Sequence, residues 1–411
     1  MKTTTAGRSH PARLERGKLF TLMVAHFFCD GYAGFLAPIL PLVIKELHLS
    51  LTSASFLASM LALSSALLQP IFGYLSDRMT RSHFVALGPL LSAIFLGSMG
   101  LADSYLLLSI FLFLGGMGVS CFHPQGTALA GETGGARRGL SISLFIGAGT
   151  AGYALGPLLI VYLVSALGLR SSWLSAVPGI LAALLIYALA PRERARSRAF
   201  QRTSLKTSLL PRWRAMALLM AIVVATSISR MGFLNFVPIY LEERGQSLVS
   251  GGWAVALFIA FGAVGATLGG PLSDRWGRKR TILLVILASI PSLYGYTWIG
   301  GMGWPASVFL ALAGATTMAS NTVLVAMSQE MLPENPGVAS SLVMGLGWGI
   351  AGVALILAGN VADALGVTTT LTFLSFTPLV GLLCGAAITE KGRMQAGSVA
   401  ASSQPPLPVR E

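Results

Sequence analysis

The chain has 411 residues, of which 54% are hydrophobic and only 10% are charged, and its formal net charge is +13. Globular domains normally carry charge on about a quarter of their positions, so a water-soluble fold could not cover its surface with so few. The composition therefore excludes a soluble protein and indicates an integral membrane protein.

Apolar windows of about 20 residues, long enough to cross a bilayer as a helix, recur along almost the whole chain. We therefore predict an all-α integral membrane protein with twelve transmembrane helices. The first span follows a basic leader but is too long for the apolar region of a signal peptide, so we expect it to be retained. Polar, Gly and Pro breaks place the spans near residues 19–45, 52–74, 83–101, 104–130, 139–164, 172–190, 215–241, 249–272, 281–300, 304–329, 338–362 and 367–389.

The basic residues are distributed unequally between the two sides of these spans. With both termini inside, all but four of the 28 Lys and Arg residues lie on the inner side. The exceptions are Lys45, Arg170 and Arg244 outside and Arg230 within a span. This is the positive-inside pattern. It predicts a multi-pass protein of the inner (cytoplasmic) membrane with both termini cytoplasmic. It also explains the net positive charge as a signal for insertion into the lipid bilayer, so nucleic-acid binding is not needed to account for that charge.

A basic loop divides the spans six and six. We expect a cytoplasmic tail (1–18), a six-helix half (19–190), a basic linker (191–214), a second half (215–389) and a cytoplasmic tail (390–411). Residues 41–50 align with residues 238–247 at an offset of 197, and the same offset carries Asp77 onto Asp274. Many transporters are built from such repeats, which rock against each other about a central site.

The loops after spans 2 and 8 share one motif. Each has a glycine, an Asp-Arg pair and further basic residues, although the first copy lacks the glycine before its last arginine. This motif resembles the signature of the major facilitator superfamily, and the resemblance covers essentially the whole chain. It implies the major facilitator fold, with two six-helix pseudo-repeats.

The charges of this motif suggest a cytoplasmic gate. Asp77 and Asp274 can face helix N-termini of the other half, where free N–H groups favour an anion. The arginines can pair with Glu132 and Glu330 at the ends of helices 4 and 10. The alternative is that these charges are solvated and serve only topology. The predicted gate residues are Gly73, Asp77, Arg78, Arg81, Glu132, Gly270, Asp274, Arg275, Arg278 and Glu330.

Four ionisable side chains lie within spans: His26 and Asp30 on helix 1, His123 on helix 4 and Arg230 on helix 7. Charges in hydrocarbon are costly and by default serve function. His26 and Asp30 are four residues apart and share a helix face. In the superfamily that the chain resembles, helices 1, 4, 7 and 10 line a central cavity, which implies that the four residues converge.

We predict that Asp30 carries the coupling proton and that His26 and His123 tune it or relay protons. Arg230 would bind an anionic group of the substrate. The alternative for Arg230 is a static Asp30–Arg230 ion pair that holds the halves together.

The small residues of helix 5, among them Gly149 and Gly152, predict close helix packing.

Two segments narrow the resemblance. Residues 26–32, HFFCDGY, and residues 121–125, CFHPQ, look like the fosmidomycin-resistance branch of the superfamily. That resemblance implies a drug:proton antiporter, although Gln125 stands where an acidic residue is expected. Gln125, Asn321 and Tyr32 join Arg230 as predicted substrate-binding residues. Asn321 is chosen because it lies at the repeat position of His123.

We therefore predict a secondary active transporter, a proton-coupled efflux antiporter for a drug or a small anionic or amphipathic compound. The alternatives are a proton symporter that imports a small organic anion and a non-transporting membrane sensor. We expect no enzyme, cofactor or metal site, because no nucleophile–base pair, metal-ligand spacing or phosphate-binding loop occurs. The expected partners are a small-molecule substrate, H⁺ and the lipid bilayer, and the expected state is a monomer driven by the proton gradient.

Overall fold

The computed structural model describes residues 15–76, 83–134, 137–189, 209–333 and 335–388, and within these ranges the regular elements are all helices. Twelve helical stretches are long and apolar enough to cross a membrane, which confirms the predicted number, with ends that differ from the predictions by a few residues. They are Arg16–Glu46, Leu51–Ser76, His83–Leu101, Tyr105–Thr133, Gly139–Leu167, Leu169–Leu189, Leu210–Glu243, Leu248–Trp276, Arg278–Ile299, Trp304–Met331, Val338–Leu365 and Val367–Ala387.

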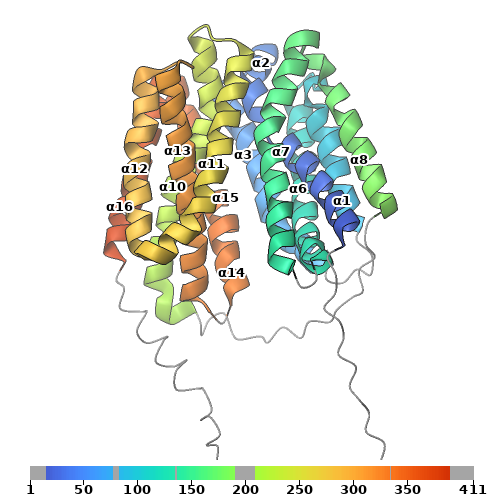
Figure 1. The fold of residues 1–411 in the computed structure, drawn as a ribbon. Coiled ribbons are helices and arrows are strands. Elements are labelled where there is room, and N and C mark those ends of the chain that lie inside the picture. Colours follow the sequence, from blue (N-terminus) through green and yellow to red (C-terminus); the bar gives the residue numbers. More distant parts are fainter. Residues whose placement is uncertain (1–14, 77–82, 135–136, 190–208, 334, 389–411) are drawn as a thin grey trace, which may run out of the picture.

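The N-terminal half forms one bundle, coloured blue to green in Figure 1. Several of its spans consist of two or three helical pieces. The elements are α1 (Arg16–Ala33), α2 (Leu36–Glu46), α3 (Leu51–Leu67), α4 (Gln69–Ser76), α5 (His83–Leu91), the π-helix η1 (Ser92–Leu96), the 3₁₀ helix η2 (Met99–Leu101), α6 (Tyr105–Thr133), α7 (Arg138–Leu167), the 3₁₀ helix η4 (Leu169–Ser175) and α8 (Ala176–Leu189).

The C-terminal half forms the second bundle, coloured yellow-green to red. Its elements are the 3₁₀ helix η5 (Leu210–Arg212), α10 (Trp213–Glu243), α11 (Leu248–Trp276), α12 (Arg278–Ile299), α13 (Trp304–Met331), α14 (Pro336–Ser341), the π-helix η6 (Leu342–Leu346), α15 (Gly347–Leu365) and α16 (Val367–Ala387).

The internal repeat is visible in how the helices begin and end. Ser50 and Ser247, which the repeat offset superposes, both cap a helix: their hydroxyls accept the backbone N–H of Ser53 and Ser250 at 3.1 and 3.2 Å. Such caps satisfy N–H groups that have no partner within the helix. Gly168 and Gly366 also correspond, and both adopt the left-handed backbone, with φ of 84° and 83°. Glycine adopts this conformation without steric cost, which allows the sharp turn into the next span.

The two bundles contact each other mainly through α3 with α15, α7 with α11 and α2 with α10. Polar contacts tie them at the end opposite the start of α1 and the end of α16, the upper end in Figure 1; there the indole N–H of Trp253 donates to the hydroxyl of Tyr162 at 3.2 Å. Lys45 forms an ion pair with Glu242. The Asp363 carboxylate accepts the backbone N–H groups of Leu51 and Thr52 at 2.8 and 2.9 Å, so it caps the start of α3 from the other half. We call this end the tied end.

Glycines bring α7 close to α1. A side chain at Gly152 would collide with the backbone oxygen of Phe27, and one at Gly156 would collide with that of Gly31. The imidazole ring of His26, on α1, occupies the place where a side chain at position 149 would lie if Gly149 were replaced. The predicted close packing by small residues is therefore present, and it sets the position of the polar face of α1.

Candidate functional site

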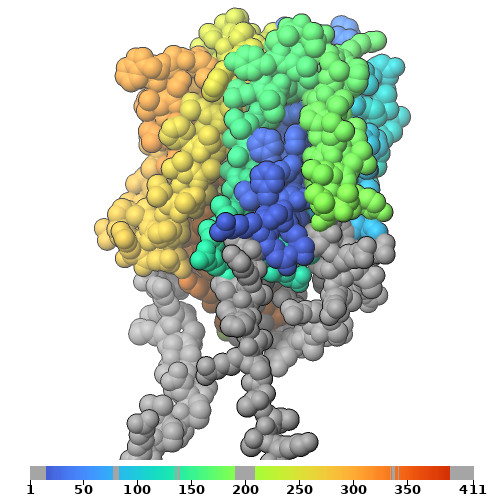
Figure 2. Space-filling view, turned by 45° about the vertical axis from the view of Figure 1, so that its right-hand side comes forward, coloured from blue at the N-terminus to red at the C-terminus, as the bar shows by residue number. Residues whose placement is uncertain are grey.

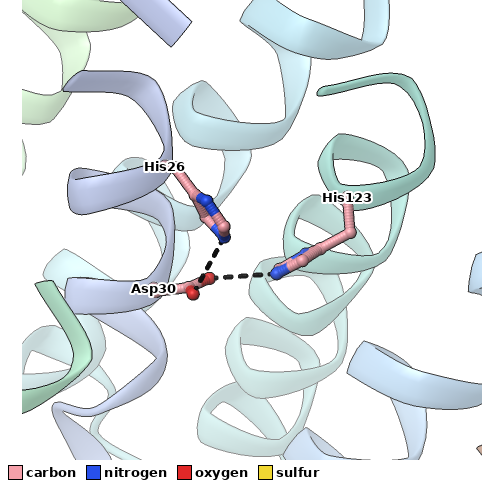
Figure 3. A group of neighbouring side chains, drawn as sticks. All are labelled: His26, Asp30 and His123. Carbon is pink, nitrogen blue, oxygen red and sulfur yellow. Dashed lines mark ion pairs between the residues drawn. The ribbon is translucent and has the colours of Figure 1, made fainter. Parts of the chain in front are cut away.

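The three titratable residues of the N-terminal half meet at one point. Asp30 on α1 places one carboxylate oxygen 3.1 Å from Nε2 of His26 and the other 3.2 Å from Nε2 of His123 on α6 (Figure 3). His26 lies one turn before Asp30 on the same helix face, as its spacing predicts. His123 approaches from the neighbouring helix, so the carboxylate links α1 to α6. We call these three residues the Asp30 cluster.

The second nitrogen of each ring is also engaged. Nδ1 of His26 lies 2.8 Å from the carbonyl oxygen of Phe145, and Nδ1 of His123 lies 2.8 Å from that of Val119. A carbonyl oxygen can only accept a hydrogen bond, so each Nδ1 must donate and therefore carries a hydrogen. Both rings thus turn Nε2 towards Asp30.

If both Nε2–carboxylate contacts are hydrogen bonds, they set a minimum number of protons on the Asp30 cluster. Each Nε2–carboxylate contact needs a hydrogen, either on the ring or on the carboxyl group, and Asp30 can carry only one. At least one ring is therefore an imidazolium. A carboxylate beside two imidazoliums and a carboxylic acid beside one imidazolium have the same net charge, one positive charge. Removal of one proton would leave a nitrogen lone pair facing a carboxylate oxygen, which breaks one contact.

The surroundings give the cluster a buried side and an accessible side. The His26 side chain is 6% exposed and stacks on the ring of Phe145 at 4.1 Å between centroids. The side chains of Asp30 and His123 keep 19% and 26% exposure. The cluster is therefore accessible on the side of Asp30 and His123 and closed on the side of His26.

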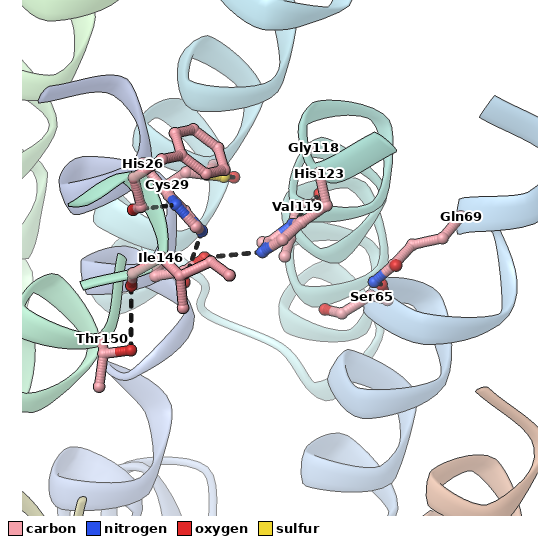
Figure 4. A network of polar contacts seen from close by, with 12 residues as sticks. His26, Cys29, Ser65, Gln69, Gly118, Val119, His123, Ile146 and Thr150 are labelled. Atoms are coloured by element: carbon pink, nitrogen blue, oxygen red, sulfur yellow. Dashed lines mark hydrogen bonds and ion pairs between the residues drawn. The ribbon is translucent and has the colours of Figure 1, made fainter. Parts of the chain in front are cut away.

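Other polar groups nearby are bonded to their own helices (Figure 4). Gln69 Nε2 donates to the carbonyl oxygen of Ser65 at 2.8 Å, and Thr150 Oγ1 donates to that of Ile146 at 3.0 Å. Tyr153 of α7 lies within electrostatic range of both Asp30 and Arg230. It therefore faces the charges of both halves.

Arg230 is the buried cation of the C-terminal half, with 7% exposure. Its guanidinium carbon lies 4.2 Å from the ring centre of Trp348, and Nη1 contacts the sulfur of Met318 at 3.5 Å. Within the residues that the structure describes, neither an ion pair with a carboxylate nor a contact with Asp30 is present. The alternative of a static Asp30–Arg230 ion pair is therefore wrong for this conformation, because α10 directs the side chain towards α13 and α15.

The other predicted substrate-binding residues lie in different surroundings. Gln125 is fully buried within the N-terminal half, where Oε1 accepts the N–H of Val85 at 3.1 Å and Nε2 donates to Ser76 at 3.1 Å. Tyr32 is 2% exposed and its hydroxyl donates to the carbonyl oxygen of Ser175 at 2.6 Å. Asn321 is half-buried on α13. Gln125 and Tyr32 are therefore bonded inside their own half.

The second copy of the gate motif is assembled within its own half. Arg278 lies 2.6 Å from Asp274 and 3.0 Å from Glu330, so the predicted pairing of α12 with the end of α13 is present. Glu132 and Arg275 are exposed. Gly73 lies on α4 and Gly270 on α11, whereas Asp77, Arg78 and Arg81 lie outside the described residues. The described gate residues contact partners of their own half only.

The Asp30 cluster also has donor atoms of the kind that bind divalent metals. One atom from each of its three residues lies within 4.8 Å of the others. Metal–nitrogen and metal–oxygen bonds are near 2.0–2.2 Å. The direct nitrogen–oxygen contacts at hydrogen-bond distance make protons the simpler occupants.

Sequence reasoning missed several of these contacts. The sequence contains many aromatic residues, and nothing in the sequence around Trp348 marks it as the partner of Arg230. The tie between Lys45 and Glu242 did have a signal, because the two residues have opposite charge and occupy equivalent positions at the repeat offset of 197.

Two of the curated proteins that the chain resembles match it over nearly all of its length. It is 28% identical over 379 residues to an uncharacterized MFS-type transporter of Bacillus subtilis (strain 168), with 89% of this chain and 91% of that protein covered. It is 26% identical over 389 residues to the fosmidomycin resistance protein of Escherichia coli (strain K12), with 92% and 94% covered.

Solved structures show the same fold. The nucleoside transporter NupG superposes with a TM-score of 0.73 at 13% identity, covering 90% of this chain and 98% of that one. A bacterial homolog of the human lysosomal transporter Spinster, in an inward-facing and unoccupied conformation, gives a TM-score of 0.70 at 17% identity, covering 90% and 97%. The sequence profile of the Major Facilitator Superfamily matches residues 22–356. The chain therefore belongs to the Major Facilitator Superfamily and is a multi-pass membrane transporter, not an enzyme.

Proposed function

We propose that this transporter is a proton-coupled antiporter that exports a small anionic or amphipathic compound. The observation that carries the proposal is the Asp30 cluster, in which one carboxylate is shared by two imidazoles from two helices. Titratable groups inside a membrane span usually lie on a proton or substrate path. The relative named for fosmidomycin resistance supports export as the direction.

The described conformation fits one step of an alternating-access cycle. The halves are tied at the end opposite the termini, through Lys45 with Glu242 and through Asp363 with the start of α3. The positive-inside pattern favours cytoplasmic termini, and with that orientation the tied end faces the outside. The protein is then in an inward-facing state, ready to take up a cytoplasmic substrate.

The gate residues belong to the opposite state of the cycle. Asp274, Arg278 and Glu330 form a preassembled group at the cytoplasmic end of the C-terminal half. In the outward-facing state, this group would meet the N-terminus of α7 and close the cytoplasmic side. The exposure of the Asp274 side chain, 63%, leaves its carboxylate available for that contact.

The coupling step follows from the proton count. While fully protonated, the Asp30 cluster holds α1 against α6 through two charge-assisted contacts. Loss of one proton breaks one contact and removes the net positive charge. The substrate and the proton are then linked electrostatically. A positive or apolar group of the substrate beside the Asp30 cluster favours loss of the proton, as antiport requires, whereas an anion near Arg230 favours the protonated cluster, as symport requires.

A proton symporter that imports an organic anion is the second candidate, because an anion that stabilises the protonated cluster can travel in the same direction as the proton. The sign of the flux separates the two. In proteoliposomes under an imposed pH gradient, the antiporter moves protons opposite to the substrate, whereas the symporter moves them with it.

The Asp30→Asn variant tests the role of the cluster in that assay. An asparagine keeps the size of the side chain and can donate to Nε2 of one ring and accept from Nε2 of the other, but it does not ionise. Proton movement induced by the substrate should be lost, with the exposed Asp103→Asn variant as the control. Coupled proton flux that persists in Asp30→Asn at the wild-type rate would refute the proposal.

A further inference from the structure

We infer that Arg230 and Trp348 form a subsite for one oxyanion group, a carboxylate or a phosph(on)ate, of an organic ligand, with the indole N–H as a specificity-determining donor. This inference deepens the proposed function, in which Arg230 binds an anionic group of the substrate. It adds the chemical class of that group and a second residue that contacts it.

The first observation is that Arg230 lacks an oxygen partner. A guanidinium has five N–H donors, and burial without oxygen acceptors is costly. Arg230 is 7% exposed, yet the one hydrogen-bond acceptor that it contacts among the described residues is the thioether sulfur of Met318, at 3.5 Å. A sulfur is a weak acceptor, so the guanidinium has no oxygen acceptor among the described residues.

The second observation is independent of the first. The indole Nε1–H of Trp348 is buried and has no hydrogen-bond partner within the described part of the chain. Buried indole N–H groups normally find an acceptor. Since the guanidinium carbon of Arg230 lies 4.2 Å from the centre of the Trp348 ring, the unsatisfied donor and the unsatisfied cation are neighbours.

Together these groups are rich in donors and poor in acceptors. The matching ligand group is one that only accepts and carries negative charge, which is an oxyanion. Guanidinium binds carboxylate and phosphate oxygens in pairs with good geometry. A neutral amide of the same size would place its own N–H groups against these donors and would bind far less well.

The stacking of Arg230 on Trp348 positions the guanidinium next to the indole. An aromatic face attracts a cation, and the attraction increases when both are removed from water. The ring therefore holds the guanidinium against α15. Tyr153, on α7 of the other half, lies in electrostatic range of both Asp30 and Arg230.

Equilibrium binding to the purified full-length protein tests the subsite. The probes are benzoate and phenylphosphonate, with benzamide as the neutral analogue, titrated calorimetrically at constant ionic strength. The variants are Arg230→Gln and Trp348→Phe, which keeps an aromatic ring and removes the N–H. Trp304→Phe is the matched control, since Trp304 is 80% exposed.

We expect at least one of the two anions to bind the wild type and benzamide not to bind. Arg230→Gln should weaken anion binding about a hundredfold and Trp348→Phe about tenfold, the factor that corresponds to one hydrogen bond. Trp304→Phe should bind as the wild type does. Tighter binding of benzoate identifies the oxyanion as a carboxylate, and tighter binding of phenylphosphonate identifies it as a phosphonate.

Two results would overturn the inference: neither anion binds the wild type, or Trp348→Phe binds them with unchanged affinity. These results differ from a failure of the proposed function. If transport is coupled to protons but anion affinity is unchanged in Trp348→Phe, only the subsite is refuted. Anion binding that depends on Arg230 and Trp348, without any coupled proton flux, would refute the proton coupling alone.

Discussion

The two halves of this transporter treat their buried charges differently. In the N-terminal half, Asp30 has both carboxylate oxygens engaged by imidazoles. In the C-terminal half, Arg230 contacts a sulfur and an aromatic ring and has no oxygen partner among the described residues. A carboxylate that has its counter-ions within the protein, as Asp30 has, needs no ligand to balance its charge. A charge without a counter-ion in the protein can take one from a ligand, so we propose complementary roles for the repeat-related helices α1 and α10.

The largest expected difference between these charges is in their contribution to stability. Asp30→Ala removes the acceptor shared by two rings and should lower the unfolding free energy by about 3 kcal/mol, the cost of breaking a buried charge pair. Arg230→Met removes an unpaired buried charge and should raise it by about 1 kcal/mol. Thermal unfolding in one detergent measures both, with exposed Asp103→Ala as the control. Equal losses in the two variants would mean that Arg230 is as well paired as Asp30.

Within the Asp30 cluster, the two histidines should differ less. Replacement of either by Gln should slow coupled proton flux about tenfold, because one charge-assisted contact is lost. His26→Gln should lower the unfolding temperature more than His123→Gln, since His26 is 6% exposed and stacks on Phe145, whereas His123 is 26% exposed. Flux assays and thermal unfolding of the two variants check this. A larger loss of stability in His123→Gln would reverse the assignment of the buried and accessible sides.

The tied end offers a comparison between a capping contact and an ordinary ion pair. Asp363→Asn should weaken the cap on α3 by about 1 kcal/mol, which shifts the balance about fivefold towards conformations open at that end. Distances between spin labels across the tied end would report the shift. Asn360→Ala, one turn away on the same helix, is the control because its side chain bonds to its own helix. An unchanged distance distribution in Asp363→Asn would show that the cap does not hold the halves together.

The ion pair of Lys45 with Glu242 should have the smallest effect. The Lys45 side chain is 62% exposed, and exposed ion pairs contribute less than about 1 kcal/mol. Single charge reversal should open the tied end slightly, and the double exchange Lys45→Glu with Glu242→Lys should restore it. Added salt should reduce the difference. Failure of the double exchange to restore the wild-type distances would argue against a direct pairing.

Much of this architecture was predictable from the sequence because it depends on local patterns. Apolar length predicted the spans, and the offset of 197 residues aligned two segments whose last residues, Ser50 and Ser247, cap equivalent helices in the structure. The spacing of His26 and Asp30 placed both on one helix face. His123 could be added only through the resemblance to a superfamily, since its neighbours come from another helix.

The remaining site predictions were limited by the direction of side chains. Depth in the membrane follows from position in a span, but Asp30 and Arg230 at similar depth point to different neighbours. Residues two apart on a helix face nearly opposite sides. Gln125 therefore points into the bundle while His123 reaches Asp30, and Tyr32 likewise points away from the face of Asp30. Trp348 needed the three-dimensional structure, because its partners lie on other helices.

The most direct test of the division of labour separates substrate exchange from proton-driven transport. Counterflow of labelled substrate across vesicles without a gradient requires binding and alternating access but no net proton movement. We expect Asp30→Asn to retain counterflow and lose transport driven by a pH gradient, and Arg230→Gln to lose both. Gradient-driven transport that survives in Asp30→Asn, or counterflow that survives in Arg230→Gln, would contradict the account.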